Sequence, residues 1–323
     1  MKTIYSGVQP TGIIHLGNYF GAIHNWLQLQ KDYNCIFSIV DLHALTVEND
    51  PVQLNKNIHD LAKIFIAVGL DPKKNIIYRQ SDVSEHAELA WILNCITPIA
   101  ELERMTQYKD KSAQHKKNVN AGLLTYPCLM AADILLYDTN FVPVGEDQLQ
   151  HVELSRIIAK KFNNKYKETF VIPENKINKV SARLKGLDDP NKKMSKSASS
   201  ANNYIALTDA PEIVKKKIKK AVTDSGSTIT YQQDKPAIAN LMTIYHLVTG
   251  LELKDIEKRF KGKGYGDFKN DLADRISDFL LPIQERFNAI EDNELEIILN
   301  NGAKRAKQIA SKKLRQVKSV IGL

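Results

Sequence analysis

The first third of the chain alternates strand and helix signals, and this order limits the possible folds more than any other feature of the sequence. The segment CIFSIV (35–40) is an almost unbroken apolar run, as expected for a strand buried on both faces of a parallel sheet. Helical spacing of apolar residues over 16–29 and 51–69 flanks this strand. Further strand signals lie at 3–7, 76–80, 141–145 and 169–173. The β-α-β-α-β order predicts an α/β fold with a doubly wound parallel sheet.

Each predicted helix presents one apolar stripe to the core. The first stripe consists of Leu16, Tyr19, Phe20, Ile23 and Leu27. The second helix starts at Pro51, and its stripe consists of Ile58, Leu61, Phe65 and Val68. From about residue 208 the patterns are mainly helical, which predicts a C-terminal helical domain. The stripe expected for its last helix consists of Ala306, Ile309, Leu314, Val317 and Ile321.

Charge suits a polyanionic partner, either nucleic acid or a nucleotide. The 323-residue chain has a net charge of +8 and an isoelectric point of about 9.1. Two helical segments are strongly basic, 215–220 and 304–318. Solvation explains such faces most simply, and contact with nucleic-acid phosphates is the alternative.

Cysteine usage and the N-terminus indicate the compartment. Cys35, Cys95 and Cys128 are far apart and odd in number, which argues against a disulfide framework or a zinc site and fits a reducing environment. The N-terminus lacks a signal-peptide core, and no apolar run approaches 18 residues. We therefore expect a cytoplasmic protein with no membrane contact.

The segment QPTGIIHLGN (9–18) joins the first predicted strand to the first helix, at the carboxyl ends of parallel strands where α/β folds bind ligands. Gly12 and Gly17 permit close backbone approach, and the helix start offers N–H groups to phosphate. His15 can donate to a phosphate oxygen. Asn18 suits either a ligand contact or a helix cap.

A second candidate is Asp133 in LLTYPCLMAADILLYD (123–138). Its neighbours one turn away are apolar, so the carboxylate shares a buried helix face. Such a group needs a donor. Either an internal Lys or Arg supplies one, or a ligand N–H or O–H does so on binding. Tyr126, two turns earlier, can offer its hydroxyl from the same face.

Two further segments carry polar chemistry. In VPVGEDQLQH (142–151) a strand ends at Gly145, and Glu146 and Asp147 follow, where acids can accept from ribose hydroxyls or start a helix. NKKMSKSASS (191–200) has no helical or strand period and is predicted to be a loop. Its lysines suit either a solvated linker or a phosphate site.

Taken together, these motifs resemble class I aminoacyl-tRNA synthetases. PTGIIHLGN is similar to the HIGH signature, with Asn18 in place of its last histidine, and KMSKS at 193–197 matches the second signature. AELERMTQYKDKS (100–112), YPCLMAADILLY, VPVGEDQLQHVELSRIIAKKFN and GKGYGDFK resemble tryptophanyl-tRNA synthetases of the bacterial type, and the likeness covers nearly the whole chain. The tyrosyl sibling family usually has Gln at Met130 and, in bacteria, an additional C-terminal domain.

The resemblance implies roles for individual residues. His15, Lys193 and Lys196 would contact the ATP phosphates, with Lys111 behind them. The wider ATP site would include Gln9, Pro10, Thr11, Gly17, Asn18, Gly145, Glu146, Asp147, Leu184, Met194, Ser195 and Ser197. Asp133 would accept the indole N–H of tryptophan, and Tyr126 and Gln148 would hold its α-amino group. The indole pocket would be shaped by Tyr5, His43, Met130, Val142 and Val144.

The resemblance also implies organisation and partners. Residues 1–186 would form a nucleotide-binding catalytic domain with the tryptophan site and a homodimer interface. Residues 187–202 would be a mobile loop, because it opens for substrates and closes for chemistry. Residues 203–323 would bind tRNA, although the last helix could instead pack back on the catalytic domain. Mg²⁺ would arrive with ATP rather than in a protein cage.

The expected activity is tryptophan–tRNA ligation without a protein nucleophile. Tryptophan would attack ATP to form an adenylate and pyrophosphate, and a terminal ribose hydroxyl of tRNA would then take the amino acid. The alternatives are tyrosine as the substrate, a nucleotidyltransferase that adenylylates a small metabolite, and a non-catalytic RNA-binding relative.

Overall fold

The structure is a computed structural model that describes residues 1–114, 119–145, 148–177, 184–196, 198, 200–232 and 234–323. These residues form two compact units. The first unit combines Met1–Gly12, Trp26–Lys179 and Ile290–Leu323, and the second combines Ile13–Asn25 and Val180–Ala289. The predicted domains at 1–186, 187–202 and 203–323 divide the chain by sequence position, whereas the compact units divide it by contacts.

A five-stranded parallel sheet forms the centre of the first unit, which confirms the predicted α/β class. Its order is β3-β2-β1-β4-β5. The strands are β1 (Thr3–Val8), β2 (Asn34–Ile39), β3 (Ile76–Arg79), β4 (Phe141–Val144) and β5 (Glu174–Ile177). The order reverses between β1 and β4, and ligands of open α/β sheets bind outside the carboxyl ends of the strands at such a point.

The predicted strand at 169–173 is wrong, because β5 begins only at Glu174. The backbone N–H groups of Thr169 and Phe170 donate to the Asn163 side chain, at 3.0 and 2.9 Å. Pro173 offers no N–H to a ladder. The chain therefore enters the sheet after this proline.

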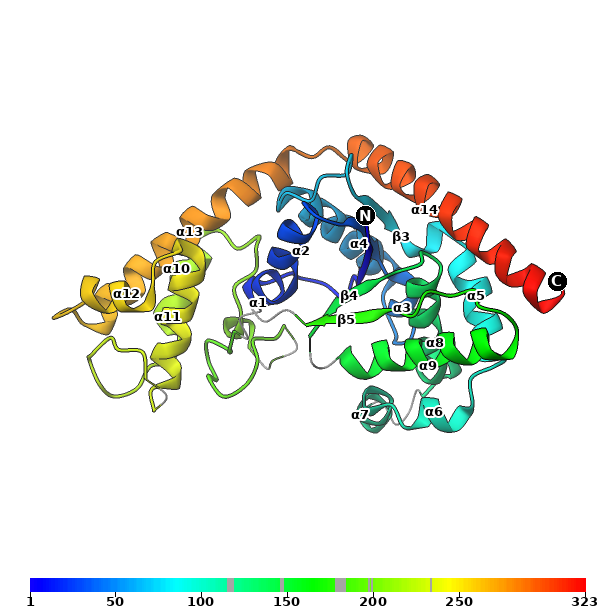
Figure 1. The fold of residues 1–323 in the computed structure, drawn as a ribbon. Helices are drawn as coiled ribbons and strands as arrows, with labels where there is room; N and C mark the ends of the chain where they lie inside the picture. Colours follow the sequence, from blue (N-terminus) through cyan, green and yellow to red (C-terminus); the bar gives the residue numbers. More distant parts are fainter. Residues whose placement is uncertain (115–118, 146–147, 178–183, 197, 199, 233) are drawn as a thin grey trace. The chain divides into compact units, whose positions relative to one another are not determined.

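Helices surround the sheet of the first unit, either directly on the strands or in a further layer on other helices (Figure 1). They are α2 (His24–Leu29, whose first two residues belong to the second unit), α3 (Asp41–Ala44), α4 (Pro51–Ala67), α5 (Glu85–Asn94), α6 (Ile99–Glu103), α7 (Thr106–Gln114), α8 (Ala121–Leu135), α9 (Leu149–Lys165) and α14 (Asp292–Ile321). The predicted stripe of α4 is buried throughout. Asp50 caps this helix by accepting from the N–H of Gln53 at 2.8 Å.

The C-terminal helix α14 packs on β3 and α5, within the first unit (Figure 1). A Cβ atom at Gly302 would lie 1.8 Å from the carbonyl oxygen of Ile77, so a glycine is needed for this close approach. Arg305 donates to the carbonyl oxygens of Pro72 and Asn75, at 3.1 and 2.9 Å. Part of the basic face of α14 therefore anchors the helix. Ile309 was predicted to be buried but is exposed.

The predicted helix at 16–29 contains a π-helical turn, Tyr19–Ile23, between α1 (Leu16–Asn18) and α2. The wider turn shifts the apolar stripe by one residue. Trp26 is consequently the buried residue, packed between Phe37 and Phe65, whereas the predicted Leu27 is only half-buried.

Helices dominate the described part of the second unit, as predicted. They include α10 (Pro211–Lys220), α11 (Pro236–Thr249), α12 (Leu253–Arg259) and α13 (Tyr265–Ala289). α13 packs against α10 and α11, and α12 packs against α11. Within the described residues of both units, no helix is long and apolar enough to span a membrane.

Candidate active site

Candidate ligand-binding residues of the first unit follow the carboxyl ends of neighbouring strands. Gln9 follows β1, His43 lies on α3 just after β2, Gln80 follows β3, and Gly145 follows β4. Parallel strands bring their carboxyl ends to one edge of a sheet, so the topology gathers residues that are far apart in sequence.

Two of these residues, His43 and Gln80, meet His86 of α5 at the Asp133 carboxylate, which comes from α8 and is 1% exposed. Its Oδ1 accepts from Gln80 Nε2 and lies 2.6 Å from His86 Nδ1. Its Oδ2 lies 2.8 Å from His43 Nε2. The sequence left open an internal Lys or Arg partner for Asp133, and the internal partners are instead two histidines and an amide.

These donors decide the charge of Asp133. Burial alone would raise the pKa of the carboxyl group, but the neighbouring His43 and His86 outweigh it, and the pKa is lowered. An ionised carboxylate has about four acceptor positions. Three are occupied, so Asp133 can still accept one hydrogen bond from a ligand.

The second nitrogen of His86 contacts a pair of buried phenols. Nε2 lies 2.8 Å from the Tyr78 hydroxyl and 2.9 Å from that of Tyr137, and these hydroxyls are 2.7 Å apart. Burial raises the pKa of both tyrosines well above the usual value. The Tyr137 ring also stacks on Tyr5, with 5.7 Å between centroids.

The other predicted tryptophan-site residues lie in the same unit. Tyr126 is buried, contacts the His43 ring edge-on, and places its hydroxyl 2.7 Å from His151 Nε2 and 3.3 Å from Gln107 Oε1. Burial raises the pKa of Tyr126 to about 12. Gln148 precedes α9. Val142 is buried, whereas Met130 and Val144 are half-buried and pack on the core that contains Tyr5.

In the second unit, His15 and two lysines of the KMSKS segment form a cationic cluster. His15 is held by its neighbours, because Leu16 N donates to Ile205 O and Leu207 N donates to Ile14 O, both at 3.0 Å. Burial, and then the charges of Lys193 and Lys196, lower the pKa of His15 to about 4. Its buried Nδ1 has no hydrogen-bond partner among the described residues.

The two lysines have different environments. Lys193 is exposed, and Lys196 is half-buried, which lowers its pKa. Within the described residues, neither lysine lies at ion-pair distance from a carboxylate. Three positively charged or donor groups without acidic partners form a favourable environment for a polyphosphate.

Asn203 fastens the KMSKS segment. Its Oδ1 accepts from Ser195 N at 2.8 Å, its Nδ2 donates to Asp188, and its carbonyl accepts from Leu187 N at 2.9 Å. Met194, with its side chain buried, donates its N–H to Leu184 O at 3.0 Å. The lysine segment is thus hydrogen-bonded at several points in this structure.

Of the remaining predicted ATP residues, some lie within the described part of the chain and others do not. Pro10 is buried, Thr11 N donates to Gln9 O at 2.8 Å, and the Asn18 side chain caps α1 by accepting from His15 N at 3.1 Å. Gly17 lies beside the His15 ring and the Met194 side chain. Lys111 lies on α7, but its side chain, like Glu146, Asp147 and Ser197, lies outside the described residues.

Comparison with known proteins identifies the family. The profile of tRNA synthetases class I (W and Y) matches residues 1–281. The chain belongs to this family. The tryptophan–tRNA ligase of Caldanaerobacter subterraneus is 53% identical to this class I synthetase, and the match covers 100% of this chain and 99% of that protein. The tryptophan–tRNA ligase of Bacillus subtilis is 51% identical, and the match covers 100% of this chain and 98% of that protein.

Solved structures agree with this assignment. Tryptophanyl-tRNA synthetase from Mycoplasma pneumoniae matches with a TM-score of 0.90 at 36% identity, over 100% of this synthetase and 98% of that chain. The Campylobacter jejuni enzyme, complexed with ADP and tryptophan, matches with a TM-score of 0.88 at 38% identity, over 100% of both chains.

Sequence reasoning missed four polar residues of this class I synthetase: Gln80, His86, His151 and Asn203. Each contacts a predicted residue from another segment, and only His151 lies in a segment that the sequence had singled out, VPVGEDQLQH. A signal existed for His86, because a histidine beside apolar helix residues must find partners if it is buried. The identity of those partners requires the fold.

Proposed function

We propose that the chain is a tryptophan–tRNA ligase. A carboxylate oxygen of tryptophan attacks the α-phosphorus of ATP, the bond to the bridging oxygen breaks, and pyrophosphate leaves. A ribose hydroxyl at the 3′ end of tRNA then attacks the adenylate carbonyl, loses its proton, and AMP leaves. Catalysis comes from positioning and from charge stabilisation at the phosphates.

One observation carries the choice of amino acid. Asp133 is buried at the strand ends, ionised, and three-quarters saturated by internal donors. It can only accept, and Met130, Val142 and Val144 lie on the same apolar core. An apolar ring with one N–H donor, which is indole, suits such a group. Tyr126 and Gln148 are proposed to hold the α-amino group.

ATP is proposed to bind through the cationic cluster of His15, Lys193 and Lys196. A lysine ammonium is a suitable point charge for a leaving pyrophosphate. The remaining predicted ATP residues, including Lys111, Glu146 and Asp147, keep their proposed roles. Mg²⁺ is proposed to arrive with ATP, because it binds phosphates more readily than protein cages.

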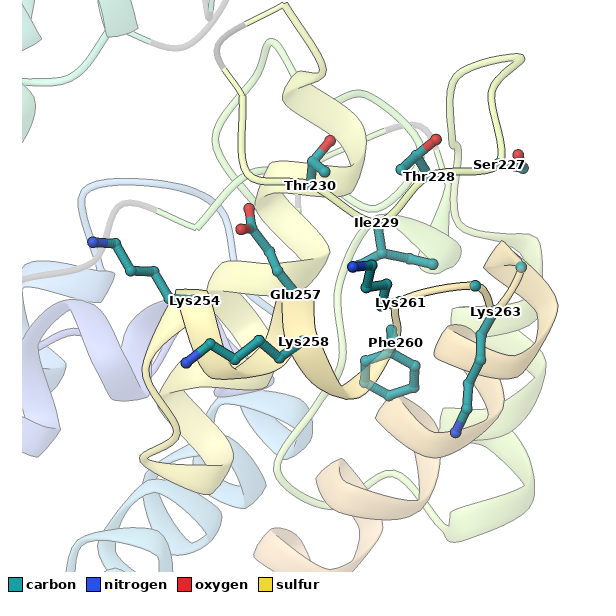
Figure 2. A pocket seen from close by; sticks show the side chains of 12 residues that line it. Ser227, Thr228, Ile229, Thr230, Lys254, Glu257, Lys258, Phe260, Lys261 and Lys263 are labelled. Atoms are coloured by element: carbon teal, nitrogen blue, oxygen red, sulfur yellow. The ribbon is translucent and has the colours of Figure 1, made fainter.

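tRNA is proposed to contact the second unit. Its α12, the following turn and the segment 227–230 line a hollow of about 740 Å³ (Figure 2). Lys254, Lys258, Lys261 and Lys263 line it, together with a single acid, Glu257. Lysines beside apolar walls suit a nucleic acid backbone with exposed bases.

A homodimer is also part of the proposal. Trp91 on α5 and Ile99 on α6 are 70% and 63% exposed. Large apolar side chains exposed on consecutive helices are typical of a surface that another molecule covers. Trp91→Ser should shift sedimentation toward the monomer.

A cytoplasmic location is proposed because both tRNA and ATP are available there.

ATP–pyrophosphate exchange with each of the twenty amino acids tests the function. We expect exchange with tryptophan alone. Exchange with tyrosine would move the chain to the sibling specificity. Exchange without any amino acid dependence would favour a different nucleotidyltransferase, and its complete absence would favour a non-catalytic RNA-binding protein.

A further inference from the structure

Behind Asp133 lies a second set of buried polar groups that no step of the reaction uses. His86 is fully buried, and its two nitrogens contact Asp133 on one side and the hydroxyls of Tyr78 and Tyr137 on the other. We propose that Tyr78, Tyr137 and His86 are positioning residues that keep Asp133 a pure hydrogen-bond acceptor, and so select a substrate ring that carries an N–H donor. This inference rests on the proposed function.

The hydrogen-bond inventory fixes the histidine tautomer. A buried phenol whose pKa is raised keeps its proton and can donate. One hydroxyl donates to His86 Nε2, and the other donates to the first hydroxyl across 2.7 Å. With a donor at Nε2, the imidazole carries a proton on Nδ1 and donates to Asp133 Oδ1.

The same inventory shows which oxygen remains open. Oδ1 accepts from both Gln80 and His86, whereas Oδ2 accepts from His43 alone. Each carboxylate oxygen has two lone-pair positions. The free position is therefore on Oδ2, and a substrate N–H is expected there.

Loss of the phenol pair would weaken this arrangement. Without a donor at Nε2, the His86 ring is held by Asp133 alone, and the hydrogen bond from its Nδ1–H to Oδ1 is less firmly placed. Weaker donation to the ionised form raises the pKa of the Asp133 carboxyl group, and a protonated carboxyl group competes as a donor for the ligand position. A site built around a required donor rejects analogues that lack it only while the acceptor is maintained.

The phenol pair makes the prediction non-additive. Either hydroxyl alone can donate to Nε2, so Tyr78→Phe or Tyr137→Phe should leave selection within about twofold of the unmodified protein. The double variant removes both donors. Coupling of this kind between groups in one network is the quantity that a double-mutant cycle measures.

The readout is a specificity ratio in ATP–pyrophosphate exchange. It compares kcat/KM for tryptophan with that for benzothienylalanine, in which sulfur replaces the indole N–H. We expect the double variant to lower this ratio by about threefold to tenfold, the value of one hydrogen bond. An unchanged ratio in the double variant, or equal losses in the two single variants, would overturn the proposal.

A matched control separates selection from stability. Tyr245→Phe removes another buried phenol, hydrogen-bonded to Asp271 in the second unit, and should lower the melting temperature without changing the ratio. If the double variant does not fold, His86→Asn and His86→Leu replace it. The asparagine amide can donate from the Nδ1 position, so His86→Asn should preserve the specificity ratio. His86→Leu has no donor and should lower the ratio. Equal specificity ratios in these two variants would contradict the proposal.

Failure of this inference can be distinguished from failure of the proposed function. An unmodified protein without tryptophan-dependent exchange would refute the function itself. Normal exchange in the unmodified protein, together with an unchanged ratio in the double variant, would refute only the positioning role.

Discussion

The two units hold their functional charges in opposite ways. In the first unit, the single negative charge of Asp133 is buried and surrounded by donors from three other segments. In the second unit, Lys193 and Lys196 lie beside a neutral His15 and, among the described residues, have no carboxylate at ion-pair distance. The Asp133 carboxylate therefore has hydrogen-bond donors before a substrate binds, whereas the two lysines have no carboxylate partner among the described residues.

The difference indicates a division of labour. A preorganised acceptor costs little reorganisation when a neutral ring binds, so it suits recognition. Unpaired cations gain most when negative charge develops beside them, so they suit catalysis at phosphates. Substitutions in the first unit should therefore change substrate binding, and those in the cationic cluster should change the rate of the chemical step.

The largest effect is expected at Lys196. Lys196→Ala should lower kcat for adenylate formation by about 100-fold to 1000-fold, the usual cost of losing one preorganised charge-stabilising group. Tryptophan KM should change little, because the contact strengthens in the transition state. Lys192→Ala is the matched control, since this lysine of the same segment is 81% exposed and paired with Asp189. A raised tryptophan KM with intact kcat would contradict the catalytic role.

Asp133→Asn should lower kcat/KM for tryptophan by about 1.5–3 kcal/mol, the value of a charge-assisted hydrogen bond. It should also lower the free energy of unfolding by about 1–3 kcal/mol, because an amide leaves at least one of the three internal donors unsatisfied. Exchange kinetics and thermal unfolding measure the two effects. Asp32→Asn is the control, because this aspartate of the first unit is exposed and its side chain makes no hydrogen bond or ion pair among the described residues.

If Asp133→Asn loses stability while its folded fraction keeps a near-normal kcat/KM, the carboxylate is purely structural and the first half of the comparison fails. A loss of kcat/KM that exceeds the matched control supports the ligand contact.

The neutrality of His15 predicts a pH effect on stability. Its pKa is lowered from 6.5 to about 4, so the unfolded chain binds more protons between these values. The associated stability is present above pH 6.5 and is lost as the pH falls toward 4. Between pH 7 and pH 5, His15 should account for about 2 kcal/mol of the decrease in the free energy of unfolding of the unmodified protein, and His15→Gln should lack this part of the decrease. Urea unfolding of both proteins at both pH values measures it, and parallel losses would show that His15 is not held neutral.

The smallest effect is expected at Asn203, which positions the lysines through the backbone of Ser195. Asn203→Ala should lower kcat by about threefold to tenfold, the value of one hydrogen bond. The adjacent Asn202→Ala is the control, because its side chain makes no hydrogen bond within the described residues. Equal rates for the two variants would show that the fastening of this segment does not affect catalysis.

The sequence predicted the sheet well where a strand carries a continuous apolar run, as in 35–40. It also predicted the start of a helix where a proline marks it, as at Pro51. It failed where a local feature changes the register. The π turn at Tyr19–Ile23 moved burial from Leu27 to Trp26, and Pro173 delayed the last strand. Propensity does not reveal the π turn, because it depends on tertiary packing, whereas Pro173 is visible in the sequence and argues against a strand that runs through it.

For the site, the sequence identified the groups that carry local motifs, such as Asp133 on an apolar helix and the lysines of KMSKS. It could not identify the donors to Asp133, because His43, Gln80 and His86 come from three separate segments. Only the strand order brings these segments together. Partners of a buried charge are therefore a property of topology rather than of spacing.

Tryptophan affinity in the absence of nucleotide tests the division of labour most directly. Equilibrium titration would give Kd for the unmodified protein, Asp133→Asn and Lys196→Ala. We predict that Asp133→Asn weakens binding by about tenfold to 100-fold, whereas Lys196→Ala changes Kd by less than about twofold, since its contact forms with the phosphates. Weaker binding in Lys196→Ala together with unchanged binding in Asp133→Asn would contradict the account.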